Sequence, residues 1–85
     1  MIIEFVITAY CLTSPGIMAN GQKVHEGSIA CPRRYKLGTE MVILGKTRQC
    51  HDRLSKKHDN RIDIWMSKCS DAVKFGKQTL KVIVK

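Results

Sequence analysis

The sequence predicts a mainly β protein, a small closed barrel of six short strands with one short α-helix near its end. The apolar segments are short, and the clearest of them alternate apolar with polar side chains, which is the period of a strand. Gly, Pro and Asn residues that favour turns separate these segments. In a chain of 85 residues an open sheet would leave exposed edges, and closure into a barrel removes them.

Three strands are expected in the first half of the chain. Alternation predicts the first strand from Ile2 to Tyr10. Two groups of turn residues make residues 11–22 a loop. Val24 to Ala30 resumes an extended pattern in which Gly27 indicates a bulge or bend. A short basic loop follows, and the β-prone residues from Met41 to Leu44 form the third strand.

Three more strands and the helix are expected in the second half. Thr47 to Asp52 continues extended after a Gly-Lys turn, and the polar residues 53–60 read as an exposed loop. Isoleucines alternate with other residues from Ile62 to Met66, which predicts the fifth strand. A helix from Lys68 to Phe75 has a serine before it and a glycine after it as capping signals. Thr79 to Val84 forms the last strand.

The charge of the chain favours an anionic partner. With 15 Lys and Arg against 7 Asp and Glu, the net charge is +8, which suits nucleic acid, an acidic membrane surface or an anionic wall polymer. Nucleic acid is disfavoured because the aromatic residues are few and scattered instead of interleaved with a basic segment. No apolar segment approaches the roughly 20 residues that cross a bilayer, so no membrane span is expected.

The cysteines leave two interpretations open. Cys11, Cys31, Cys50 and Cys69 are almost evenly spread and form no CxxC pair, which argues against a zinc ribbon. A small domain gains stability from one or two disulfides in an oxidising environment, and four buried thiols are the alternative. The histidine beside Cys50 fits no standard metal spacing, so we expect no metal and no other cofactor.

Several short segments, taken in order, resemble a known family. They are Ile7-Thr8-Ala9-Tyr10, Met18-Ala19-Asn20-Gly21, Gly27-Ser28-Ile29-Ala30, Leu37-Gly38-Thr39, Asp52, Arg61-Ile62-Asp63-Ile64, and Ala72 followed by Phe75-Gly76. Their order and content resemble the three-aspartate (3D) domain over nearly the whole chain. The resemblance implies a double-psi β-barrel, the fold of a domain found in membrane-bound lytic transglycosylases, wall proteins and phage proteins and related to barwin and the rare-lipoprotein-A enzymes.

Two of the three aspartates that give the family its name map onto this chain. Asp63 falls in the strand where the family has its catalytic acid, and Asp52 lies 11 residues earlier, at the family spacing. Ala30-Cys31-Pro32 stands where the first aspartate is usual, so either Cys31 replaces it or the loop has shifted. The usual Gly-Gly after the second aspartate is replaced by residues 53–55.

The resemblance implies cleavage of the bond between N-acetylmuramic acid (MurNAc) and N-acetylglucosamine (GlcNAc). One carboxyl group, Asp63, would donate a proton to the glycosidic oxygen and then accept one from the sugar's 6-hydroxyl. On periodicity alone Asp63 would be a solvated residue on the outside of a strand. Asp52 could orient substrate, share a proton with Asp63 in one open groove, or pair with Arg53 or Arg61.

The remaining candidate residues have two interpretations each. Thr8, Tyr10, Trp65 and Arg61 are candidates for substrate binding, with the two aromatic rings stacking on sugars, whereas aromatic residues in a small barrel more often pack the core. The basic cluster of the 53–60 loop is a solvated loop or holds anionic wall polymer. Its members are Arg53, Lys56, Lys57 and His58.

Two functions of different class therefore stand as expectations. The first is a peptidoglycan-directed enzyme resembling lytic transglycosylases, with Asp63 as acid/base and Asp52 as its helper. The second is a module without catalysis that binds wall glycan or another virion protein through the same basic barrel. Residues 1–7 carry Glu4 and lack the basic start and long apolar segment of a secretory signal, so we expect a virion-associated or envelope-acting protein that is not simply exported.

Overall fold

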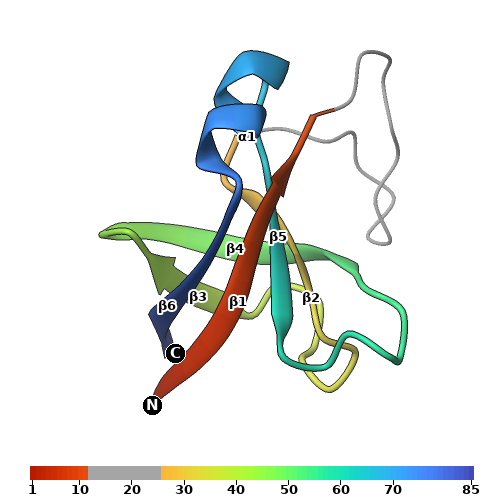
Figure 1. Cartoon of the computed structure of the whole chain (residues 1–85). Coiled ribbons are helices and arrows are strands. Elements are labelled where there is room, and N and C mark those ends of the chain that lie inside the picture. The colour runs from red at the N-terminus through yellow and green to blue at the C-terminus, as the bar shows by residue number, and fades with distance from the viewer. Residues whose placement is uncertain (12–25) are drawn as a thin grey trace.

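The computed structural model of the chain describes residues 1–11 and 26–85 (Figure 1). The expected loop 11–22 and the beginning of the strand expected from Val24 lie almost entirely outside the described residues. Within the described part, six strands and one helix follow the expected order. They are β1 (Ile2–Tyr10), β2 (Ser28–Cys31), β3 (Glu40–Ile43), β4 (Lys46–Arg53), β5 (Arg61–Trp65), α1 (Cys69–Phe75) and β6 (Lys77–Val84).

The strands form a closed barrel in the order β1-β5-β2-β4-β3-β6, which confirms the mainly β class with a six-stranded barrel and one short helix. Two neighbouring pairs, β1 with β5 and β2 with β4, are parallel. The other neighbours are antiparallel. The helix α1 lies at the end of the barrel opposite the two chain termini (Figure 1).

Apolar side chains from all six strands fill the barrel interior, because each strand turns alternate residues inward. On β1 these are Phe5 and Ile7, and on β5 they are Ile62 and Ile64, all at most 1% exposed. The rest of the buried cluster comes from the other four strands: Ile29, Cys31, Met41, Ile43, Cys50 and Val82. Alternation therefore leaves the intervening residues of β1 and β5 on the outside of the barrel.

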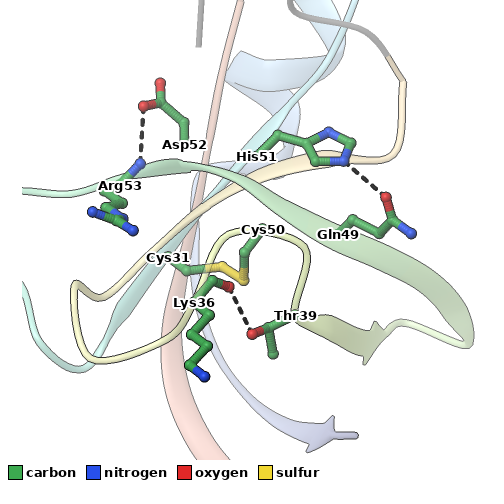
Figure 2. The surroundings of a disulfide bond; sticks show 8 residues. All are labelled: Cys31, Lys36, Thr39, Gln49, Cys50, His51, Asp52 and Arg53. Carbon is green, nitrogen blue, oxygen red and sulfur yellow. Dashed lines mark hydrogen bonds between the residues drawn. A yellow bond between two sulfur atoms is a disulfide. The ribbon is translucent and has the colours of Figure 1, made fainter. Parts of the chain in front are cut away.

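Two disulfides tie the barrel, and this outcome selects the first of the two interpretations of the cysteines. Cys11–Cys69 links the end of β1 to the start of α1. Cys31–Cys50 joins β2 to β4 inside the core (Figure 2). Both sulfur-bearing side chains of this second disulfide thus face the buried interior.

Most strand boundaries after β1 differ by one or two residues from the sequence-based expectation, and β2 begins at Ser28 instead of Val24. The strand expected from Ile62 to Met66 runs from Arg61 to Trp65. Three of the differences have a clear structural cause. Leu44 has a positive φ of 54° and belongs to the β3–β4 turn with Gly45, so the third strand ends one residue early. β4 continues to Arg53 because this residue pairs with Cys31 on β2. β6 starts at Lys77 because its pairing with β1 extends as far as Thr8.

The expected helix is confirmed with its first turn beginning at Cys69, and Gly76 ends it as expected. The expected cap by Ser67 is wrong, because the N-cap residue is Lys68 and no side chain makes a cap hydrogen bond there.

Candidate functional site

A row of paired residues crosses the outer surface of five strands. Asp52 on β4 pairs with Ala30 on β2, and Ala30 pairs with Asp63 on β5. Asp63 pairs with Thr8 on β1, and Thr8 pairs with Lys77 on β6. Residues directly opposite each other on neighbouring strands point to the same face of a sheet. We call these five residues the aspartate row.

Simple alternation directs Asp63 outward. Its neighbours Ile62 and Ile64 are fully buried in the core, so the residue between them faces outside. The Asp63 side chain is nevertheless only 16% exposed, because other side chains cover it. The expectation of a freely solvated aspartate is therefore wrong for this position.

Arg61 and Thr8 cover the Asp63 carboxylate. Arg61 Nε donates to Oδ1 at 2.8 Å and Nη2 donates to Oδ2 at 3.1 Å. The Thr8 hydroxyl donates to Oδ1 and accepts a hydrogen bond from Arg61 Nε at 3.2 Å. A bidentate guanidinium fixes both the position and the plane of a carboxylate. Each oxygen of Asp63 thus accepts a hydrogen bond from Arg61, which suits the ionised form of the carboxyl group.

A β-bulge directs Asp52 to the same face. Cys50 points into the core, and strict alternation would also send Asp52 inward. The pairing between β2 and β4 shifts by one residue, so that Ile29 faces Cys50 while Ala30 faces Asp52. His51 is the extra residue, and a bulge of this kind re-aims the side chains that follow it. Figure 2 shows His51 and Asp52 on the side of β4 opposite to the disulfide.

Buried hydrogen bonds hold the bulge. His51 is 9% exposed, and its Nδ1 lies 3.1 Å from the hydroxyl of the fully buried Ser28. Its Nε2 lies 2.8 Å from the Gln49 amide oxygen (Figure 2). Because an amide oxygen only accepts, Nε2 donates to Gln49, and Nδ1 of the neutral ring accepts from Ser28. Since Ser28 is sealed from solvent, this chain of hydrogen bonds positions β4 and is not a nucleophilic pair.

Asp52 and Asp63 lie on either side of Ala30. Their Cα atoms are two strand spacings, about 10 Å, apart. Asp52 Oδ1 accepts a hydrogen bond from the Arg53 backbone N–H at 2.9 Å. Arg61, one of the two arginines that the sequence offers as a partner for Asp52, pairs with Asp63 instead.

The negative charges of both aspartates affect the phenol of Tyr10. The pKa of its phenol is raised to about 12, first by burial and then by the negative charges of Asp52 and Asp63. The phenol is therefore protonated at neutral pH and can donate a hydrogen bond. Tyr10 has the same orientation on β1 as Thr8, as expected from the sequence.

Trp65 lies opposite Tyr10 at the end of the β1–β5 pairing. It is partly buried on the outer side of β5 and does not belong to the core cluster of the barrel. Its indole Nε1 is buried and has no hydrogen-bond partner in the part of the chain that the structure describes. Core packing inside the barrel is therefore not its role, and the sugar-stacking interpretation stays a prediction.

A cavity of about 320 Å³ opens beside Thr8 and Arg61. The other residues around it come from β1, from the loop before β5 and from the start of β6: Val6, His58, Asn60 and Lys77. Sequence reasoning missed the contribution of Lys77, since no motif marks it. The sequence marks His58 only as part of a basic loop, and in the structure it is partly buried at this cavity.

The candidate residues predicted from sequence thus gather on the outer face of neighbouring strands: Thr8, Tyr10, Asp52, Arg61, Asp63 and Trp65. Within the described ranges, no helix is long and apolar enough to cross a membrane. Neither a protein-family model nor a curated protein matches this sequence.

Proposed function

We propose that this chain is a peptidoglycan-directed protein of the 3D-domain type that cleaves MurNAc–GlcNAc bonds in the manner of a lytic transglycosylase. The observation that carries the proposal is Asp63, held at the centre of the aspartate row between Asp52 and a basic cavity. The ordered motifs of the sequence support it. The parallel pairs β1/β5 and β2/β4 are compatible with the double-psi topology that the resemblance implies.

In this reaction Asp63 acts twice. Its protonated carboxyl group gives a proton to the glycosidic oxygen while the bond to C1 of the muramic residue breaks. The 6-hydroxyl of that residue then attacks C1 and gives its proton to the Asp63 carboxylate, which closes a 1,6-anhydro ring. No water is consumed. The single acid differs from the two carboxylates that ordinary glycoside hydrolysis requires.

Arg61 must yield for Asp63 to carry a proton. Both oxygens of Asp63 accept hydrogen bonds from the guanidinium. When one of these oxygens is protonated, it becomes a donor, and a donor does not pair with the N–H groups of Arg61. The Arg61 side chain is 35% exposed and lies at the cavity beside Thr8. Bound substrate can therefore draw it away from Asp63.

The test is release of 1,6-anhydro-muropeptides from purified sacculi. Asp63→Asn keeps the shape of the side chain but removes the transferable proton, so we expect turnover to fall by roughly 100-fold or more. Asp59→Asn is the matched control, because Asp59 is exposed in the 53–60 loop and lies outside the aspartate row. Equal activity of the wild type and Asp63→Asn would remove Asp63 from the reaction.

A module that binds glycan or a virion partner without cleaving is the second candidate. The bidentate Arg61–Asp63 pair favours it, since the guanidinium occupies both carboxylate oxygens that the reaction would need. Cys31, buried in a disulfide at the place of the first family aspartate, favours it as well. Salt-sensitive sedimentation of the wild type with sacculi and no soluble anhydro product would select this candidate.

A further inference from the structure

The cavity beside the aspartate row is basic. Arg61 and Lys77 border it from opposite sides of β1, and His58 borders it from the loop before β5. No acidic side chain is among the described residues that line it. The Asp63 carboxylate, which contacts two of the lining residues, is turned toward Arg61 and Thr8. An opening with this lining attracts an anionic group.

Lys77 is the uncommitted cation of this cavity. Its ammonium group has no acidic partner within ion-pair distance in the described part of the chain. Lys77 lies directly opposite Thr8 on the outer face and is the basic end of the aspartate row. Arg61 is different, because Asp63 already occupies its guanidinium. A ligand would therefore find a full positive charge at Lys77 and a shared one at Arg61.

The other walls suit a sugar that carries the anion. Val6 supplies an apolar surface, and Thr8 and Asn60 supply polar groups. Pockets for small ligands commonly combine an apolar wall with a few polar groups that fix orientation. The volume of about 320 Å³ is at the lower end of the range for such pockets.

We propose that this cavity binds a carboxylate of the peptidoglycan strand, with Lys77 as its principal partner and Arg61 as the link to Asp63. This inference rests on the proposed function. Peptidoglycan offers that chemistry at two places: the lactyl group of a muramic residue that lacks its peptide, and the carboxylates of the stem peptide. A carboxylate bound here competes with Asp63 for the Arg61 guanidinium, and this competition is the means by which substrate loosens the Arg61–Asp63 pair.

The experiment compares three disaccharides that stay intact because none contains the bond that the enzyme would cleave, which runs from C1 of a muramic residue to the next GlcNAc. They are GlcNAc–MurNAc with a free lactyl carboxylate, the same disaccharide with its stem peptide attached, and the neutral disaccharide N,N′-diacetylchitobiose (hereafter chitobiose). Dissociation constants come from titrations followed by amide chemical shifts. The wild type is compared with Lys77→Ala and with Lys81→Ala, a control on the same strand and the same face whose side chain lies outside the cavity.

We expect the wild type to bind at least one acidic disaccharide about 3- to 10-fold more tightly than chitobiose, the range of one partly exposed ion pair. Lys77→Ala should abolish this preference without weakening chitobiose binding, and Lys81→Ala should keep it. Which acidic disaccharide binds more tightly identifies the source of the carboxylate. Equal affinity for all three, or equal losses in both variants, would overturn the carboxylate site while leaving glycan binding intact. Failure to bind any disaccharide would also overturn it, and failure to sediment with sacculi would overturn the proposed function itself.

Discussion

The two aspartates of the row reach the same surface by different means. On β5, alternation between the buried Ile62 and Ile64 turns Asp63 outward. On β4, Asp52 is outward only because the bulge at His51 reverses the alternation. We call Asp63 with its covering side chains Arg61 and Thr8 the β5 arm, and Asp52 with the bulge at His51 the β4 arm. The orientation of the β5 arm is determined by the local sequence. The orientation of the β4 arm depends on the pairing of β4 with β2, which is distant in the sequence.

The two carboxylates also differ in what holds them. Asp63 is fixed by side chains of β5 and β1, with a guanidinium on both oxygens. Asp52 accepts a hydrogen bond from the backbone of the next residue on its own strand. The β4 arm should therefore be sensitive to changes in the core behind it, and the β5 arm to changes on the surface beside it.

The largest expected effect comes from opening the disulfides. Replacing Cys31 and Cys50 by Ala should lower the free energy of unfolding by about 3 kcal/mol, the value of a loop of this length, and should loosen the bulge next to it. Replacing Cys11 and Cys69 should cost about as much or more, because the loop is longer. Urea unfolding measures both losses. Under native conditions, amide hydrogen exchange at residues 50–53 should become faster through local opening only in the variant that lacks Cys31–Cys50. Equal protection of these amides in both variants would contradict a bulge held by Cys31–Cys50.

The next effect tests the buried histidine. His51→Ala removes the hydrogen-bond partner of the buried Ser28 hydroxyl and should lower the free energy of unfolding by about 1 to 3 kcal/mol. His58→Ala, on the loop, should change it by about 0.5 kcal/mol or less. Urea unfolding compares the two variants. Similar small losses would mean that His51 does not support the β4 arm.

Titration of Tyr10 reports on both arms at once. Its folded pKa of about 12 is above the ordinary 10, so the unfolded chain loses this proton at a lower pH than the folded one. The stabilising contribution is complete below pH 10 and disappears as the pH rises toward 12. Phenolate absorbance of the wild type minus that of Tyr10→Phe should give the midpoint, with circular dichroism checking that the barrel remains folded. Asp52→Asn and Asp63→Asn should each lower the midpoint, and no response to one of them would detach that arm from Tyr10.

The smallest effect is expected for Asp52→Asn on stability. The amide oxygen of Asn can accept the same Arg53 backbone hydrogen bond, so the free energy of unfolding should change by about 0.5 kcal/mol or less. Thermal unfolding is the measurement. A loss several times larger would show that the charge of Asp52, and not only its hydrogen bond, supports the β4 arm.

Sequence patterns predicted the elements and the β5 arm well, since both follow from local periodicity. The barrel class, the six strands and the helix were identified with boundary errors of a few residues. The bulge at His51 could not be predicted, because it arises from the pairing of β4 with β2. The same holds for the Cys31–Cys50 link and for Lys77 at the cavity, which strand pairing brings beside Thr8. The coverage of Asp63 by Arg61 was missed because alternation describes the face of a residue but not its neighbours.

The most direct test of Asp63-dependent transglycosylation is a digestion of sacculi by the wild type in ¹⁸O-labelled water. If the 6-hydroxyl of the muramic residue attacks C1, the new ends are 1,6-anhydro rings, one water lighter than reducing ends and free of the label. Mass spectrometry of the released muropeptides distinguishes these products. We expect unlabelled anhydro ends from the wild type and almost none from Asp63→Asn. Reducing ends that carry ¹⁸O, or no soluble product from the wild type, would contradict transglycosylation at Asp63.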